Sequence, residues 1–117
     1  MEYYFEEEND WGNIEYKKAF IDMDMDKIKK YATQLKFRII EGEGVAIYII
    51  GVGDKGNAIG ILKSDIHRHN TIMNEIINEI DAVISSYKII NISENQVIII
   101  YMVQNKFNLD DIAFLKG

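Results

Sequence analysis

The sequence contains no cysteine and no proline, and these two absences narrow the kinds of protein it can be. Without cysteine the chain cannot form disulfides, and it cannot hold zinc or iron–sulfur clusters through thiolates. No apolar run reaches the roughly 20 residues of a membrane helix, so no membrane partner is expected. Together these features are typical of a cytoplasmic domain in a reducing compartment.

Several common catalytic and nucleotide-binding motifs are also missing. There is no G-x-x-x-x-G-K-[ST] phosphate loop, so we expect this chain itself not to bind GTP. The sequence does not indicate a catalytic pair of nucleophile and histidine. Cysteine is absent, and the only two histidines, His67 and His69, lie in one short stretch. Two residues apart on a helix, they point in different directions and are not expected to chelate one metal ion.

Charge is unevenly distributed along the 117 residues, whose net charge is −6. Overall acidity argues against a protein that coats nucleic acid by bulk electrostatics. Residues 17–38, however, carry seven basic and three acidic side chains, which leaves a local basic surface on a predicted helix. Lys29, Lys30, Lys36 and Arg38 are the candidate contacts for RNA or another partner on this surface. The alternative is a helix face that is simply solvated.

Hydrophobic periodicity predicts an α+β fold. We expect a mixed, mainly antiparallel sheet in the order β-α-β-β-α-β-β, with two helices packed on one face. Residues 1–12 are an acidic arm, residues 13–104 a single domain, and residues 105–117 a tail. The expected strands cover residues 13–20, 45–52, 58–62 (returning as a hairpin), 87–92 and 96–103. The expected helices run from Asp24 or Asp26 to Gly42 or Gly44, and over 65–85 with Ser64 as cap.

Three carboxylates and one lysine are the candidate catalytic residues. Glu15 and Lys17 share one face of the first strand, and Asp54 follows the buried strand 45–52. If these strands are neighbours, Glu15 and Asp54 approach each other, and Asp10 can complete a set of oxygen ligands. Such a set suits Mg²⁺ or Mn²⁺, which could activate water against a phosphodiester while Lys17 stabilises the phosphate charge. Alternatively, Glu15 and Lys17 are a surface pair, and Asp54 serves only its turn.

Three segments, Gly12–Lys17, Thr33–Gly44 and Ala46–Gly56, resemble the region before the G domain in the GTP-binding protein one and two group of translational GTPases. Gly53 departs from that pattern, which has an acid there. The resemblance implies an accessory domain without GTP binding, which contacts RNA, the ribosome or a G domain. Residues 111–117 resemble the first strand of a G domain, as in a truncated GTPase; an ordinary C-terminal segment is the alternative.

A more distant resemblance uses some of the same residues. Glu15-x-Lys17 on an early strand and Gly51-Val52-x-Asp54-x-Gly56 on a hairpin are similar to the Schlafen-type AlbA-like domain. This resemblance implies a metal-dependent endoribonuclease acting on tRNA-like RNA. Its acidic metal site would fall on Asp10, Glu15 and Asp54, with Lys17 beside it.

We favour the accessory domain over the ribonuclease and over a third reading, a module for protein interaction. The open edge of the 87–103 hairpin is a candidate surface for homodimer formation by sheet extension. The catalytic alternative depends on the strand at 13–20 lying beside the strand at 45–52.

Overall fold

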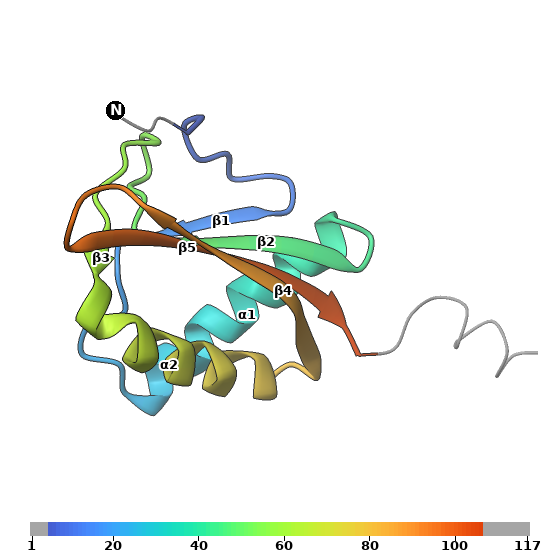
Figure 1. Cartoon of the computed structure of the whole chain (residues 1–117). Coiled ribbons are helices and arrows are strands. Elements are labelled where there is room, and N and C mark those ends of the chain that lie inside the picture. The colour runs from blue at the N-terminus through green and yellow to red at the C-terminus, as the bar shows by residue number, and fades with distance from the viewer. Residues whose placement is uncertain (1–4, 107–117) are drawn as a thin grey trace, which may run out of the picture.

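The computed structural model describes residues 5–106 and shows an α+β fold (Figure 1). Two helices, α1 (Met25–Glu41) and α2 (Ile66–Asn78), lie on one side of a five-stranded sheet. The strands are β1 (Ile14–Lys17), β2 (Val45–Ile50), β3 (Ile61–Leu62), β4 (Ala82–Asn91) and β5 (Gln96–Asn105). The predicted fold class is confirmed. Within the described residues, neither helix is long and apolar enough to cross a bilayer.

The sheet is organised around β5. Strand β2 pairs antiparallel with one side of β5, β4 pairs antiparallel with it along most of its length, and the short β3 pairs with its beginning. Strand β1 runs parallel to β2, with Glu15 opposite Tyr48. The predicted contact between the first strand and the central buried strand is therefore confirmed. Among the described strands β4 pairs with β5 alone; sheet extension into a homodimer stays a prediction.

Helix α1 forms as the sequence predicts. The Asp24 side chain accepts a hydrogen bond from the Lys27 N–H at 2.8 Å and satisfies one free donor of the first turn. The buried side chains Ile28, Ala32, Leu35 and Ile39 recur at helical spacing. The helix ends at Gly42, but Glu43 and Gly44 adopt the positive φ angles of 55° and 107° that reverse the chain. Gly42 is required for another reason: a Cβ there would collide with the Val45 carbonyl oxygen.

The second helix is shorter than predicted. It stops at Asn78 rather than near residue 85, and β4 begins at Ala82 rather than at residue 87. The last turn tightens as Ile80 N–H bonds the Ile77 carbonyl, and Asp81 then reverses the chain at φ 55°. Ile84, expected on the helix, pairs with β5 instead. The predicted Ser64 cap is also wrong, because Ser64 lies in a short 3-10 helix (Lys63–Asp65) and Asp65 is the cap residue.

The predicted hairpin between residues 45–52 and 58–62 is largely absent. A single bridge joins Val52 and Ala58, and β3 pairs with β5 instead of β2. Gly51 and Gly60 both have positive φ angles, at 100° and 79°, and direct the returning chain toward β5. The first strand is likewise shorter than expected, because the chain leaves β1 after Lys17 and buries Phe20 in the core.

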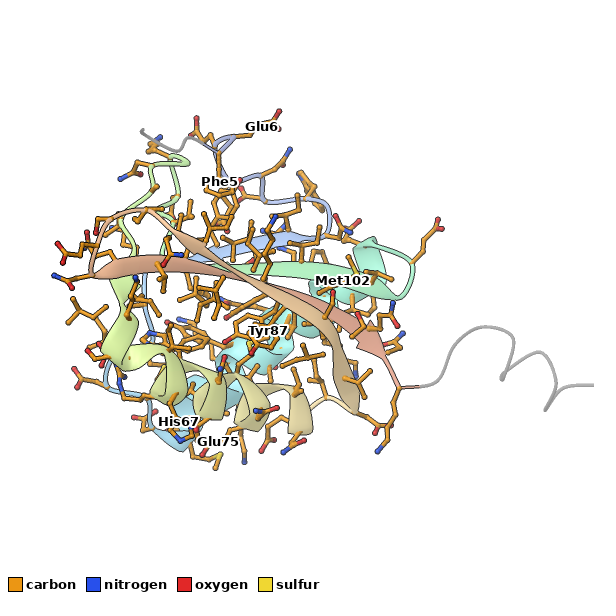
Figure 2. The ribbon with its side chains drawn as sticks, viewed as in Figure 1. Phe5, Glu6, His67, Glu75, Tyr87 and Met102 are labelled. Carbon is orange, nitrogen blue, oxygen red and sulfur yellow. The ribbon has the colours of Figure 1, made fainter. Side chains whose placement is uncertain are left out.

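Apolar side chains pack on both faces of the sheet. The main core, which includes Phe20, Leu35, Tyr48 and Tyr101, fills the space between the sheet and the helices. On the opposite face a smaller cluster around Tyr16 is covered by Phe5 from the N-terminal segment (Figure 2). The described part of the acidic arm is therefore packed against the domain. Residues 107–117, including the segment that resembles a G-domain strand, lie outside the described residues.

Candidate functional site

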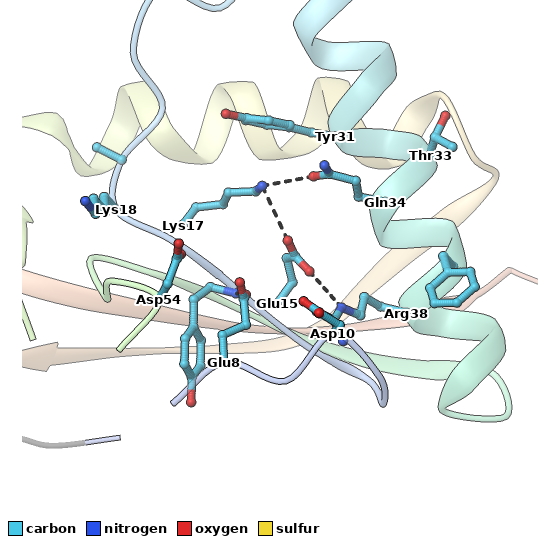
Figure 3. A pocket seen from close by; sticks show the side chains of 13 residues that line it. Glu8, Asp10, Glu15, Lys17, Lys18, Tyr31, Thr33, Gln34, Arg38 and Asp54 are labelled. Carbon is cyan, nitrogen blue, oxygen red and sulfur yellow. Dashed lines mark hydrogen bonds and ion pairs between the residues drawn. The ribbon is translucent and has the colours of Figure 1, made fainter. Parts of the chain in front are cut away.

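A pocket of about 770 Å³ opens between β1, α1, the segment around residue 8 and the turn at residue 54 (Figure 3). Its acidic lining residues are Glu8, Asp10, Glu15 and Asp54. Its basic lining residues are Lys17, Lys18 and Arg38. Uncharged lining residues are Tyr16, Ala19, Tyr31, Thr33, Gln34 and Phe37. The structure thus brings all four candidate catalytic residues of the sequence to one pocket.

Glu15 and Arg38 form a buried ion pair at the base of this pocket. Arg38 Nε donates to Glu15 Oε2 at 2.7 Å, and both residues are less than 8% exposed. Other guanidinium N–H groups donate to the backbone carbonyls of Asn9, Trp11 and Gly12 at 2.8–3.1 Å. Arg38 therefore connects α1 to the chain that leads into β1.

Lys17 contacts three groups in the same pocket. Its ammonium donates to Gln34 Oε1 at 2.9 Å, lies 3.4 Å from a Glu15 carboxylate oxygen, and stands 4.1 Å from the centroid of the Tyr31 ring (Figure 3). The ring face attracts the cation electrostatically. Glu15 is consequently shared by two cations, and neither its carboxylate nor the Lys17 ammonium is a free group.

Glu8 is a pocket residue that sequence reasoning missed. Its Oε2 accepts a hydrogen bond from the Tyr16 N–H at 2.6 Å, and its own N–H bonds the Asp54 carbonyl at 2.7 Å. Partial burial raises the pKa of the Glu8 carboxyl; the Tyr16 N–H opposes this, while the charges of Glu15 and Asp54 add to it. In the sequence, Glu8 cannot be told apart from its neighbours Glu6 and Glu7 by any spacing rule. What distinguishes Glu8 is the hydrogen bond that its side chain accepts from Tyr16 on β1.

The predicted metal site is not formed in the part of the chain that the structure describes. No group of three aspartate, glutamate or histidine side chains between residues 5 and 106 could hold a metal ion. Asp10 and Asp54 line the pocket and are exposed, whereas the Glu15 carboxylate is paired with Arg38 and Lys17. Asp10, Glu15 and Asp54 all line the pocket, but they do not form a set of ligands around one point.

The basic surface predicted on α1 is present with one correction. Lys29, Lys30 and Lys36 are exposed, and none of them makes an ion pair with the described residues. We call these three residues the α1 lysine surface. Arg38 does not belong to it, because this side chain is buried against Glu15. Helical spacing alone could not show this, since the partner of Arg38 lies on β1.

The two histidines have separate environments, as their spacing predicts. His67 is exposed. His69 is 1% exposed, and its Nε2 accepts the Phe20 N–H at 3.1 Å. The other ring nitrogen lies 2.9 Å from the Asp65 carbonyl, so Nδ1 carries the proton of a neutral ring. Burial lowers the pKa of His69, with a smaller contribution from the charge of Arg68, against opposing effects of Asp65. His69 thus anchors the segment that follows β1.

Comparison with known proteins gives partial support for the GTPase resemblance. No family model matches the sequence, and no solved structure does. An uncharacterized protein of Acanthamoeba polyphaga mimivirus is 36% identical over 110 residues, which are 93% of this chain and 58% of that protein. GTP-binding protein 2 of Homo sapiens and of Mus musculus is 37% identical over 62 residues, which are 53% of this chain and 10% of each of those proteins.

The chain therefore spans little more than half of the mimivirus protein and a tenth of GTP-binding protein 2. A region of this chain is related to part of a GTP-binding protein, as the sequence motifs indicated. These comparisons contain no counterpart of the Schlafen-type resemblance.

Proposed function

We propose that this chain forms an accessory domain of a GTPase-like protein and contacts RNA or the ribosome, alongside a G domain in the same or a related protein. The likeness to 62 residues of GTP-binding protein 2 supports the GTPase relationship. These 117 residues contain no G-x-x-x-x-G-K-[ST] phosphate loop, so we assign this chain an accessory role and not the binding of the nucleotide. The observation that carries RNA contact is the exposed α1 lysine surface, whose lysines form no ion pair with residues 5–106.

Three exposed ammonium groups on one helix are a suitable surface for phosphates. Lys29 and Lys36 lie seven residues apart, which places them on one stripe of α1, and Lys30 lies next to Lys29. Each lysine that neutralises a phosphate releases bound counterions, so the affinity falls as salt rises. The rest of the acidic molecule repels phosphates, which favours one preferred orientation on RNA.

The test compares two triple alanine variants in binding to tRNA and to ribosomes. The first removes the α1 lysine surface, and the matched control removes the exposed Lys63, Lys88 and Lys106. We expect the first variant to bind more weakly, with a slope of log affinity against log salt that is smaller by about 0.7–0.9 for each lost phosphate contact. The control should keep the original slope.

Two results would contradict the proposal. Unchanged binding by the first variant would remove the α1 lysine surface as the contact. No binding of the unaltered protein to tRNA or ribosomes at low salt would remove RNA contact altogether. We do not propose the metal-dependent ribonuclease, because the described residues contain no set of ligands and Glu15 is already paired with cations.

A further inference from the structure

An exposed aromatic ring, that of Phe37, lines the pocket described above. Phe37 is 46% exposed, a large fraction for a phenylalanine held on a rigid helix. The other ring on α1, Tyr31, already carries the Lys17 ammonium. Phe37 has no aromatic or cationic partner among the described residues. Its ring is therefore available for stacking.

The same ring is adjacent to the α1 lysine surface. Phe37 follows Lys36 in the chain and lies seven residues after Lys30, which places it on one helical stripe with that lysine. Exposed lysines beside an exposed ring are the two elements with which proteins hold unpaired nucleotides: the cations bind phosphates and the ring stacks on a base.

The pocket lining, unlike the α1 lysine surface, carries both charges: four carboxylates against Lys17, Lys18 and Arg38. Because Glu15 is paired with Arg38 and Lys17, the accessible acceptors are the exposed carboxylates of Asp10 and Asp54. Carboxylates repel phosphate but accept hydrogen bonds from amino groups on bases, such as N4 of cytosine. A nucleotide would thus be oriented with its phosphate toward the helix lysines and its base toward an exposed carboxylate.

We propose that the pocket receives an unpaired RNA base that carries an exocyclic amino group, stacked on Phe37 with its amino group facing the exposed carboxylate of Asp10. The inference rests on the proposed RNA contact and adds its substrate class, single-stranded RNA with amino-bearing bases. The volume of about 770 Å³ lies within the range of about 300–1,000 Å³ that is usual for small-molecule pockets. Uracil has a carbonyl oxygen in place of the cytosine amino group. Because that oxygen and a carboxylate both only accept hydrogen bonds, uracil would bind less well than cytosine.

The experiment measures the binding of labelled oligocytidylate and oligouridylate of equal length by fluorescence anisotropy. We expect oligocytidylate to bind about fivefold more tightly or better, in line with the cost of a mismatched base contact. Phe37→Ala should weaken oligocytidylate binding by about 5- to 150-fold and leave the salt slope unchanged. Tyr87→Ala, which removes a ring that is 55% exposed on β4, is the matched control and should bind normally.

A second variant separates base recognition from stacking. Replacing Asp10 by alanine should reduce the preference for oligocytidylate to about one without weakening oligouridylate. Equal affinity of the unaltered protein for both oligonucleotides would overturn the inference. Normal binding by Phe37→Ala, when loss of the α1 lysine surface weakens binding, would also overturn it but leave the proposed function intact. If neither oligonucleotide nor tRNA binds at low salt, both proposals fail.

Discussion

Replacing Arg38 by methionine would leave the Glu15 carboxylate buried beside a single remaining cation. In the intact protein Arg38 Nε lies 2.7 Å from that carboxylate, and both groups are shielded from water. Methionine keeps most of the packing volume of the arginine stem but removes the charge and all of its N–H donors. The substitution therefore tests the electrostatic and hydrogen-bonding contribution separately from the packing.

We expect the free energy of unfolding to fall by about 3–5 kcal/mol, the usual cost of removing one partner of a buried pair. Lys17, at 3.4 Å from Glu15, remains and moves the expected value toward the lower end. The lost bonds to the carbonyls of Asn9, Trp11 and Gly12 act in the other direction, although water can reach those carbonyls in part.

Urea unfolding followed by far-ultraviolet circular dichroism measures the change. Trp11, the single tryptophan, is 70% exposed and is therefore a weak fluorescence reporter of unfolding. At a urea dependence of about 1–3 kcal/mol per molar, the midpoint should fall by more than about 1 M.

The double variant Glu15→Leu/Arg38→Met is the control, because it removes both members of the buried pair and leaves only the partly exposed Lys17. It should be more stable than Arg38→Met alone by about 2 kcal/mol. A loss of less than about 1 kcal/mol in Arg38→Met, or a double variant no more stable than that single variant, would refute the reasoning.

Three other predictions concern buried polar groups. Because burial lowers the pKa of His69, the unfolded chain binds the proton more readily; stability should therefore be full above about pH 6.5 and fall as the pH drops from there toward the folded pKa. This is measured as the urea midpoint against pH. The Tyr48 hydroxyl is buried and has no hydrogen-bond partner in the described part of the chain, so Tyr48→Phe should leave stability unchanged or raise it by about 1 kcal/mol. Tyr101→Phe breaks the hydrogen bond to Asn70 and should cost about 0.5–1.5 kcal/mol in the same assay.

Matched variants keep these predictions refutable. His67→Gln alters the exposed histidine and should keep the acid loss of stability, whereas His69→Gln should reduce it; an equal decline in both variants would assign it to carboxyl groups instead. For the tyrosines, a larger loss in Tyr48→Phe than in Tyr101→Phe would mean that the Tyr48 hydroxyl has a stabilising partner.

The elements that the sequence predicted best are those decided by local chemistry. Helix α1 has a capping Asp24, a regular apolar stripe and two glycines after its end, and it forms at the expected place. Helix α2 was predicted too long, because apolar residues continue into β4 and no glycine or proline marks the change. The backbone reversal falls on Asp81, which adopts that conformation less readily than glycine and so marks the end of the helix less clearly.

The candidate catalytic residues of the sequence all line one pocket, but they do not form the metal site that was expected of them. The parallel pairing of β1 with β2 brings Glu15 and Lys17 to one pocket with Asp54. Arg38 was assigned to the solvent-exposed face because its neighbours at helical spacing include exposed lysines. Glu8 could not be selected from three adjacent glutamates. Both errors concern residues whose partners are distant in the chain.

By itself, the sequence determined the fold class, the start of α1, the deeply apolar strands and the three exposed lysines of that helix, because periodicity and capping act over a few residues. Only the tertiary structure decided that Arg38 is buried against Glu15, 23 residues away, and that these two charges leave no free carboxylate at the base of the pocket. Burial of a charge depends on what packs against it from other elements, and that information is not local to any stretch of the chain.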